Sequence, residues 1–429
     1  MKNTFSIEAL PEKWITKKIG DIFTIQQGIT LSRKKDNGKV LLPFLRTSNV
    51  FWGQLELLKL DEMFFSEDQV SRLKLEKGDL LVCEGGDIGR TAIWNNEITL
   101  CCHQNHVHRL RKKDENIEPL FFMYWMQAGY KILHLYDQEG NRTTIPNLSR
   151  SRLSNFVVPV PPLPEQQKIA HVLSTIQDAK EKTEAVIAAA KELKRSLMKY
   201  LFTYGPVPVQ DAPNVRLKET EIGMIPEEWE IKKIKDINIY KNKTLNPSDT
   251  PDINFEYYSI PAYQDDGNPI IESGKKIHSS KLLLSENTVL FGKLNPRVEK
   301  VWIVTNINDE LTKIGSTEWL PVLPIKSVNS KYLYYLMWSN YIMDKAKTMV
   351  TGSTPSRQRV NPKSFYNIRM PVPQINEQLK IVSIFNSIDE KISSESSNYI
   401  RLELLFTSML EQLMTGTLRV DDLDLEGVA

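Results

Sequence analysis

The chain has 429 residues, of which 41% are hydrophobic and 25% are charged, and a formal net charge of only +2. This length predicts two or three hydrophobic cores in a globular protein, and the small net charge neither favours nor excludes nucleic acid as a partner. Three cysteines do not make a disulfide framework, and neither a signal pattern nor a membrane-length apolar run is present, so we expect a cytoplasmic protein.

The first predicted domain spans residues 1–163 and contains short strands that are rich in β-branched and aromatic residues. Strands are expected over residues 39–50, 79–83 and 91–94, and a helix or buried segment over residues 120–127. The Gly-rich segment after the second strand lacks the spacing of a phosphate-binding Walker loop. We therefore expect a close backbone turn there.

A long helix is predicted over residues 164–205, because residues 165–204 contain neither Gly nor Pro and Gly205-Pro206 would stop it. Apolar residues recur along it at alternating spacings of four and three, which is typical of a coiled-coil seam. The seam residues expected to pair with another helix are Val172, Ile176, Val186, Leu193 and Leu197. The Pro-rich residues 206–220 are predicted to be a linker without elements of its own.

A second domain is predicted over residues 221–375, followed by a second long helix over residues 376–416 and a tail over residues 417–429. The seam of this helix consists of Ile381, Phe385, Ile388, Ile392, Leu402, Phe406 and Met409. Neither helix can bury its apolar stripe alone. The sequence therefore predicts an α+β protein, with two mixed domains separated by two long helices that pair as an antiparallel coiled coil.

An internal repeat supports this organisation. Eight of twelve residues are identical between residues 11–22 and residues 226–237, and seven of eleven between residues 159–169 and residues 371–381. The two offsets are nearly equal, which indicates a tandem duplication with pseudo-twofold character. The interiors have diverged, although residues 75–94 and 284–303 share a pattern of strand, Gly-containing loop and strand. Divergent binding surfaces would explain this, and so would neutral drift of loops.

The repeat edges resemble the specificity subunits of type I restriction-modification enzymes. The resemblance lies in Pro-Val-Pro-Pro-Leu-Pro-Glu-Gln-Gln-Lys-Ile at residues 159–169, in the junction at residues 218–229 and in residues 409–420. Gln374-Ile375-Asn376 departs from the family pattern, where Pro-Leu-Pro is more usual, and we interpret this as a changed helix cap. The resemblance implies two target recognition domains that read the halves of a split site in double-stranded DNA.

The same resemblance implies partners for the chain. These are two modification (methyltransferase) subunits bound to the helices, and restriction (translocase/endonuclease) subunits that complete the enzyme. S-adenosylmethionine, ATP and Mg would belong to those partners, with no cofactor in this chain.

Candidate DNA-binding residues combine cations, hydroxyls and amides in predicted loops, because Arg can grip guanine, Asn and Gln adenine, and Lys, Ser or Thr phosphate. In the first repeat they are Thr30, Ser32, Arg33, Lys34, Arg90, Arg142 and Thr143. In the second repeat they are Lys293, Asn295, Arg297, Arg357, Gln358 and Arg359, beside Lys300 in the same basic loop. Each of them could equally be a residue of a solvated loop.

The sequence predicts neither a catalytic site nor a metal site. The sequence has no Asn-Pro-Pro-Tyr or Asp-Pro-Pro-Tyr segment, so no catalytic residue is assigned, and Asn361-Pro362-Lys363-Ser364-Phe365 is only superficially similar. Residues 101–108 hold two Cys and three His but read as one structural strand, so no metal site is expected. The alternatives to a DNA-reading adaptor are a self-sufficient DNA methyltransferase or nuclease, and a coiled-coil scaffold without a DNA role.

Overall fold

The computed structural model describes residues 10–30, 39–135, 147–306 and 308–422. The chain forms two compact units. Unit 1 consists of residues 1–184 and 397–429, and unit 2 consists of residues 185–396. The two long helices are α5 (Leu163–Tyr204) and α11 (Ile375–Thr415), so each unit contains one half of each helix. None of the helices in the described part combines the length and apolar character needed to cross a membrane.

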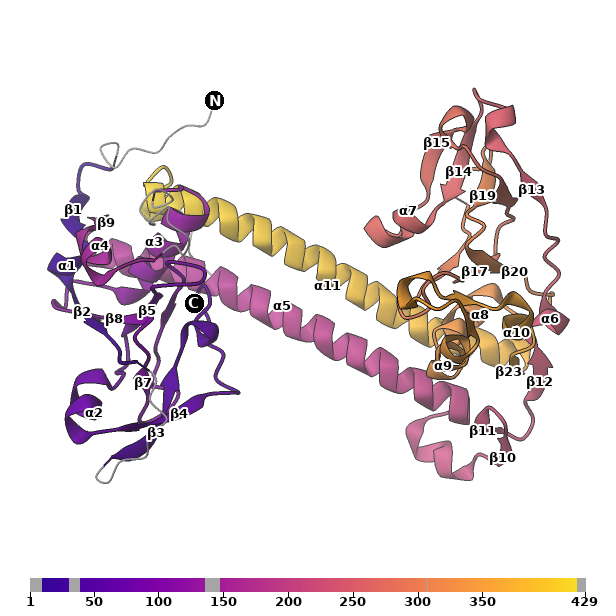
Figure 1. The fold of residues 1–429 in the computed structure, drawn as a ribbon, viewed down its shortest axis with the longest axis horizontal. Helices are drawn as coiled ribbons and strands as arrows, with labels where there is room; N and C mark the ends of the chain where they lie inside the picture. The colour runs from indigo at the N-terminus through magenta and orange to yellow at the C-terminus, as the bar shows by residue number, and fades with distance from the viewer. Residues whose placement is uncertain (1–9, 31–38, 136–146, 307, 423–429) are drawn as a thin grey trace. The chain divides into compact units, whose positions relative to one another are not determined.

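Unit 1 is built on a four-stranded sheet with the order β2-β8-β5-β6 and a three-stranded sheet with the order β4-β3-β7 (Figure 1). A short pair of strands, β1 and β9, closes the domain beside α5. The strands are β1 (Ile15–Lys18), β2 (Phe23–Gln27), β3 (Val40–Leu45), β4 (Asp61–Phe65), β5 (Leu80–Cys83), β6 (Thr91–Ile93), β7 (Cys102–His103), β8 (Val107–Lys112) and β9 (Val157–Val160). The helices are α1 (Ile19–Ile22), α2 (Glu67–Leu73), α3 (Pro119–Lys131) and α4 (Arg150–Asn155), with a 3-10 turn at Thr47–Asn49. The strands predicted over residues 79–83 and 91–94 and the helix over residues 120–127 are therefore confirmed, whereas the strand predicted over residues 39–50 ends at Leu45 and a 3-10 turn follows it.

Unit 2 contains a five-stranded sheet with the order β13-β16-β19-β14-β15 and a three-stranded sheet with the order β18-β17-β20. Its strands are β10 (Leu217–Thr220), β11 (Gly223–Pro226), β12 (Glu230–Lys233), β13 (Thr244–Leu245), β14 (Asn254–Tyr258), β15 (Ile270–Ser273), β16 (Lys281–Leu283), β17 (Val289–Gly292), β18 (Val301–Ile303), β19 (Thr312–Gly315), β20 (Trp319–Val322), β21 (Val350–Thr351), β22 (Arg359–Val360) and β23 (Arg369–Val372). Its helices are α6 (Ile234–Ile237), α7 (Ile260–Asp265), α8 (Ser330–Met337), α9 (Asn340–Thr348) and α10 (Pro362–Tyr366), with 3-10 turns at Val209–Asn214, Pro247–Asp249, Gly274–Lys276 and Pro355–Arg357.

The segment predicted to be a linker is more ordered than expected. It contains the 3-10 turn Val209–Asn214 and the strand β10, which pairs with β11 in a hairpin. Lys218 fixes this hairpin to unit 2, because its ammonium donates to the carbonyls of Glu227 (2.7 Å) and Trp229 (2.6 Å). The prediction that residues 206–220 hold no element is therefore wrong. Pro and polar residues marked the turn correctly, but they do not exclude a short hairpin.

The duplicated motifs occupy equivalent places in the two units. Trp14 and Trp229 are both buried, and the strands that follow them pair with β9 and β23, respectively. Each long helix ends at a glycine with a left-handed backbone, Gly416 at φ +70° and Gly205 at φ +80°. Such a residue ends a helix without a steric penalty only when it lacks a Cβ atom. Gly416 lies against Trp14 within unit 1, and Gly205 lies against Trp229 within unit 2.

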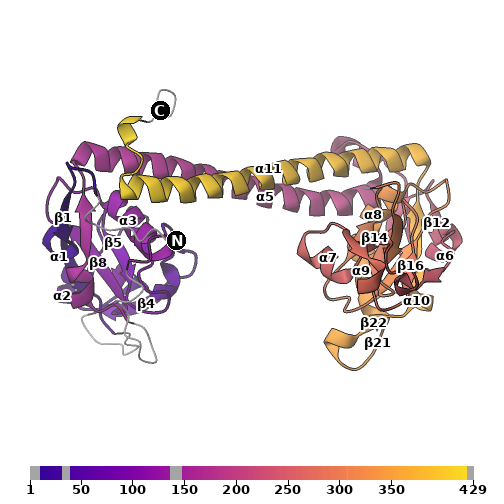
Figure 2. The same cartoon turned by 90° about the horizontal axis from the view of Figure 1, so that it is seen from above.

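The helices pair antiparallel within each unit, as predicted. In unit 1, Glu165 of α5 pairs with Arg419 after α11 (2.8 Å), whereas Lys180, farther along α5, pairs with Glu403, earlier in α11. In unit 2, Lys194 pairs with Asp389, and Phe202 contacts Phe385, with ring centroids 6.2 Å apart. Figure 2 shows the two helices side by side in each unit.

The buried face of the helices differs in part from the predicted seam. Val172, Ile176 and Phe406 lie in the core of unit 1 and Met409 packs against it; Ile381 and Phe385 lie in the core of unit 2 and Leu197 packs against it. Ile388, Ile392 and Leu402 are half-buried, so their role in pairing stays a prediction. Val186 and Leu193 are 41% and 52% exposed, so the seam prediction is wrong for them. The buried face depends on which domain packs on each half of a helix, which a continuous heptad pattern does not record.

Candidate nucleic-acid interface

The structure brings the candidate residues of the second repeat together. Lys293, Asn295 and Arg297 lie in the loop after β17. Arg357 and Gln358 lie in the connection between β21 and β22, and Arg359 begins β22. The two segments are joined by backbone hydrogen bonds from Asn295 to the Gln358 carbonyl (2.8 Å) and from Val360 to the Lys293 carbonyl (2.9 Å). In Figure 2 the hairpin lies at the end of unit 2 farthest from its parts of α5 and α11. The candidate residues of this repeat therefore share one surface.

Two cations at equivalent places have structural roles. Lys300 directly precedes β18 and is 4% exposed, and its ammonium donates to the carbonyls of Val298 (2.5 Å) and Asn295 (3.3 Å). Burial lowers the pKa of this lysine. Arg90 directly precedes β6 and its side chain is 13% exposed; it donates to the Thr47 carbonyl (3.0 Å) and lies over the Phe51 ring. Both side chains therefore close a loop, which for Arg90 favours a structural role over the predicted DNA contact.

Of the remaining candidates of the first repeat, Thr30 alone belongs to the described residues. Thr30 is exposed and follows a bridge between Ile29 and Gln104. Five predicted residues lie outside the described residues: Ser32, Arg33, Lys34, Arg142 and Thr143. The Gly-rich segment turns closely, as predicted, since the Gly89 N–H donates to the Cys83 carbonyl (3.0 Å).

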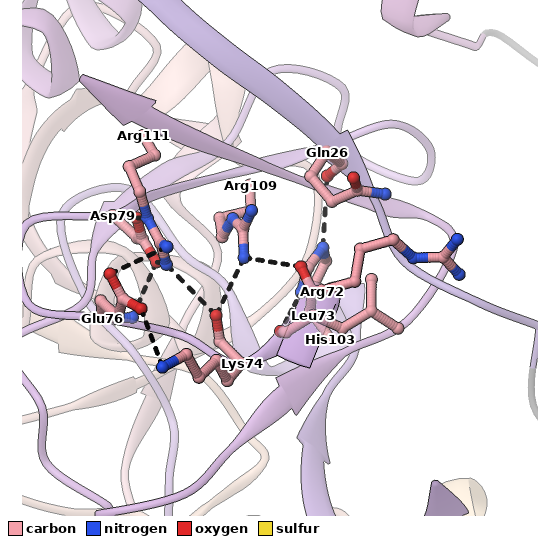
Figure 3. A network of polar contacts seen from close by, with 9 residues as sticks. All are labelled: Gln26, Arg72, Leu73, Lys74, Glu76, Asp79, His103, Arg109 and Arg111. Carbon is pink, nitrogen blue, oxygen red and sulfur yellow. Dashed lines mark hydrogen bonds and ion pairs between the residues drawn. The ribbon is translucent and has the colours of Figure 1, made fainter. Parts of the chain in front are cut away.

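Two arginines of β8, Arg109 and Arg111, form a polar network inside unit 1 (Figure 3). Arg109 donates to the carbonyls of Arg72 (3.0 Å) and Lys74 (2.9 Å). Arg111 binds both carboxylate oxygens of Asp79, each at 2.7 Å, and this hydrogen bonding raises the pKa of the arginine. These contacts fix the segment between α2 and β5, so the two arginines hold the domain together.

Residues 101–108 form two strands rather than the single strand predicted. The bridge residue Gln104 and a turn at residues 105–106 separate β7, which pairs with β3, from β8, which pairs with β2 and β5. The strand pairing buries His103 and His108, and His106 stays exposed in the turn. Burial raises the pKa of Cys101 to about 12 and that of Cys102 to about 11, so both thiols are protonated at neutral pH. Within the described ranges no three His, Cys, Asp or Glu side chains form a metal-binding group.

The two repeats share a backbone frame that the sequence did not reveal. The Glu84 N–H donates to the His106 carbonyl (2.9 Å), as the Lys293 N–H donates to the Glu318 carbonyl (2.8 Å). The carbonyl of Glu84 in turn accepts from Leu148 (2.8 Å), as that of Lys293 accepts from Val360. Glu84, His106 and Asn147 thus correspond to Lys293, Glu318 and Arg359.

The side chains on this frame differ in chemical type between the two units. In unit 1 a carboxylate follows the central strand and a histidine faces it, with Glu84 Oε2 3.6 Å from His106 Nδ1. In unit 2 a lysine follows the central strand and a carboxylate faces it, with Lys293 Nζ 3.9 Å from Glu318 Oε2. One backbone frame therefore presents different chemistry in each unit. Only the folded structure joins these residues, since they lie on separate segments.

The family model of the type I restriction modification DNA specificity domain matches the chain twice, over residues 11–191 and residues 226–404. The chain belongs to this family. Two full-length relatives carry specificity-subunit names, both from Methanocaldococcus jannaschii. The chain is 23% identical to the putative type I restriction enzyme MjaX specificity subunit, with 96% of each chain covered. It is 22% identical to the MjaVIII specificity subunit, with 97% of this chain and 95% of that one covered.

Solved structures of the same kind share the specificity-subunit fold. The S subunit of a type I restriction-modification system from M. genitalium matches with a TM-score of 0.58 over 96% of this chain and 97% of its own, at 16% identity. A chain from work on complex assembly and conformational transition of the type I R-M system matches with a TM-score of 0.55, at 15% identity over 95% of this chain and 99% of its own. At these identities the likeness concerns the fold alone.

Proposed function

We propose that this chain is the DNA sequence-specificity subunit of a type I restriction-modification complex. Unit 1 reads one half of a bipartite, asymmetric site in double-stranded DNA and unit 2 reads the other half. One observation carries the proposal: the two units have separate hydrophobic cores and one backbone frame, but different side chains on that frame. Direct readout requires different donors and acceptors for different bases, so such a pair of units suits an asymmetric target.

The proposal includes partners that supply the chemistry. Two modification subunits would dock on the helices and methylate DNA with S-adenosylmethionine, and restriction subunits would add ATP- and Mg-dependent translocation and cleavage. This chain itself would hold none of these cofactors and catalyse no step. The specificity-subunit names of its relatives and the absence of a methyltransferase motif from its sequence support this division of labour. Its DNA target would lie in the cytoplasm.

Exchange of one domain interior tests the reading of two half-sites. Residues 23–155 are replaced by the corresponding residues of a relative, the chain is expressed with its partner subunits, and methylated motifs are mapped across a genome. We expect one half of the motif to change, since the core of unit 2 contains no residue of the exchanged segment. The matched exchange of residues 238–367 should change the other half. A change of both halves, or of neither half, in a single exchange would refute independent reading.

A second experiment tests the absence of catalysis. The purified chain alone is incubated with DNA, S-adenosylmethionine and Mg²⁺, and methyl transfer is compared with that of the assembled complex. The lone chain should transfer none. Reproducible methylation by the lone chain, free of partner subunits, would overturn the non-catalytic part of the proposal.

A further inference from the structure

Arg359 is held in a fixed position on the candidate interface of unit 2. It begins β22, where its backbone pairs with Thr351 on one side and forms a bridge with Leu294 on the other. The next residue, Val360, is fully buried in the core of unit 2. Side chains on such a paired backbone are placed more accurately than those on a free loop.

Glu318 orients the guanidinium of Arg359. The carboxylate accepts hydrogen bonds from Nε, 3.2 Å from both oxygens, and from Nη2, 3.1 Å from Oε1. Glu318 itself is fixed, because its N–H donates to the Ser316 hydroxyl (3.2 Å) and the buried Trp319 follows it. These bonds raise the pKa of Arg359. The carboxylate therefore occupies the side edge of the guanidinium.

The end edge of the same guanidinium has no hydrogen bond to any of the described residues. An arginine has five N–H donors, and Glu318 engages only the edge formed by Nε and Nη2. Within the described part of the chain Nη1 has no hydrogen-bond partner, and the side chain of Arg359 is 47% exposed. Nη1 and the outer hydrogen of Nη2 form the fork that matches two acceptors side by side, such as O6 and N7 of guanine.

The neighbouring charge argues for a base rather than a phosphate as the acceptor. A phosphate placed at this fork would carry a negative charge close to the Glu318 carboxylate, which costs free energy by repulsion. The guanine edge presents two acceptors without a net charge. The ammonium of Lys293, which donates to the Thr317 carbonyl (2.9 Å) and lies 3.9 Å from Glu318 Oε2, offsets part of this repulsion but adds no fork of its own.

The corresponding place in unit 1 supports a role in sequence readout. Asn147 occupies the position of Arg359 on the shared backbone frame. Its Oδ1 atom is buried without a hydrogen-bond partner among the described residues. The frame is thus the same in both units, while the side chain at this position is a half-buried amide in unit 1 and an exposed guanidinium in unit 2.

We propose that Arg359 reads a guanine in the half-site of unit 2 and that Glu318 is the residue that positions it. This inference rests on the proposed function, and it assigns a specificity-determining role to Arg359 and a positioning role to Glu318. A correct bidentate contact discriminates against the wrong base by about 5- to 150-fold. Lysine keeps the charge but has no planar fork, so it cannot replace this contact.

The test uses the chain assembled with its modification subunits. Arg359→Lys and Glu318→Gln are each compared with wild type by mapping methylated motifs and by competition binding with single-base variants of the site. We expect Arg359→Lys to relax one guanine position in one half-motif, with discrimination reduced at least about 5-fold. Glu318→Gln should weaken discrimination at that same position to a lesser degree, since an amide carbonyl can still accept one of the bonds. The other half-motif should be unchanged.

A matched control comes from another Arg–Glu pair in the same unit. Arg369 is 49% exposed and its Nε lies 3.2 Å from Glu221 Oε1, at the start of β23. Arg369→Lys should leave the motif unchanged. If Arg359→Lys leaves the motif unchanged and only alters affinity and its salt dependence, Arg359 contacts phosphate and the inference is overturned.

Failure of the Arg359 inference and failure of the proposed function give different results. If wild type methylates a bipartite motif but Arg359→Lys and Glu318→Gln do not alter one shared base, only this inference fails. If the wild-type complex recognises no defined motif, the proposed function fails with it. Thermal unfolding of both variants distinguishes an altered readout from a misfolded unit 2, and a misfolded Arg359→Lys leaves Glu318→Gln to decide the question.

Discussion

Gln166 and Gln378 show how a single repeated residue ties a long helix to its domain. Each is fully buried near the start of its helix. Gln166 accepts from the Glu118 N–H (2.9 Å) and donates to the carbonyls of Pro161 (2.7 Å) and Asn116 (3.2 Å). Gln378 makes the same three bonds with Asn329, Pro373 and Ser327. The repeat made this Glu-Gln pair visible in the sequence, but the sequence alone could not show that its amide satisfies three buried backbone groups.

Replacing either glutamine should destabilise one unit. Gln166→Ala leaves three backbone groups of unit 1 without partners, and we expect a loss of about 3 kcal/mol in the free energy of unfolding. Gln378→Ala should act equally on unit 2. Urea unfolding with probes in each unit measures both effects. Gln167→Ala, at an exposed position of the same turn, is the control and should change stability by less than about 0.5 kcal/mol. Equal effects of Gln166→Ala and Gln167→Ala would contradict this account.

His103 should make unit 1 sensitive to acid. Its ring is fully buried, with Nδ1 3.2 Å from the Leu73 carbonyl and Nε2 3.2 Å from the Gln26 carbonyl (Figure 3). Burial, together with the smaller effect of the Arg109 charge, lowers the pKa of His103 to about 4 in spite of the two carbonyls, which raise it. Below about pH 6.5 the unfolded chain binds a proton that the folded unit does not. The free energy of unfolding therefore decreases as the pH is lowered from about 6.5 to about 4.

The expected loss is about 2 kcal/mol between pH 7 and pH 5. Urea unfolding of unit 1 at both pH values measures it, in wild type and in His103→Gln. The variant should be less stable at pH 7 because it disturbs buried hydrogen bonds, but its stability should depend less on pH. The buried His108, whose pKa burial also lowers, contributes the same background to both proteins. Identical pH dependence of the two proteins would contradict the prediction.

At the scale of elements, periodicity predicted the helices better than their contacts. The predicted bounds 164–205 and 376–416 each lie one residue from the observed ones. A helical segment that contains neither Gly nor Pro and is followed by a glycine ends at that glycine, because no earlier residue interrupts the helix. The buried residues of the seam were harder to predict from the sequence, since Lys180 and Thr183 are buried while Val186 and Leu193 are exposed. Lys180 is buried because its ammonium pairs with Glu403 and lies over the Phe406 ring, a contact that a hydrophobic pattern cannot predict.

Phe406 should be essential for joining α11 to unit 1. It is 3% exposed, and its ring contacts Tyr124 of α3 (centroids 6.0 Å apart) and the ammonium of Lys180 (4.6 Å). Phe406→Ala removes this buried side chain and should lower the free energy of unfolding of unit 1 by about 3–5 kcal/mol. Leu404→Ala, on an exposed face of the same helix, should cost less than about 0.5 kcal/mol. Hydrogen exchange of residues 397–415 measures both, and equal protection in the two variants would show that Phe406 does not hold the helix.

At the scale of the whole molecule, the repeat predicted two equivalent domains, and the structure explains how one chain completes both. In unit 2 the end of α5 and the motif at Pro226 are joined by the covalent segment 206–225, with Trp229 against Gly205. In unit 1 the end of α11 meets the motif at Pro11 without a covalent link, and a Cβ atom on Gly416 would lie 2.4 Å from Pro11 Cγ. The interiors of the two domains were less predictable than the repeat edges. Their loops have diverged, and the ion pairs within each domain join segments that are separate in the sequence.

This equivalence predicts that the chain tolerates circular permutation. A Gly/Ser linker joins the C-terminal residue to the N-terminal residue, and the chain is opened within the 3-10 turn Val209–Asn214, which buries no residue. The hairpin β10–β11 stays with unit 2, so both cores keep all their contacts, and exposed breaks of this kind are usually tolerated. We expect the free energy of unfolding of each unit to lie within about 1 kcal/mol of the wild-type value. With its partner subunits, the permutant should methylate the same motif as wild type. A second permutant, opened inside the buried α3, should lose unit 1. If the first permutant also loses a unit, or recognises a different motif, the covalent connection at residues 206–225 does more than join two equivalent domains.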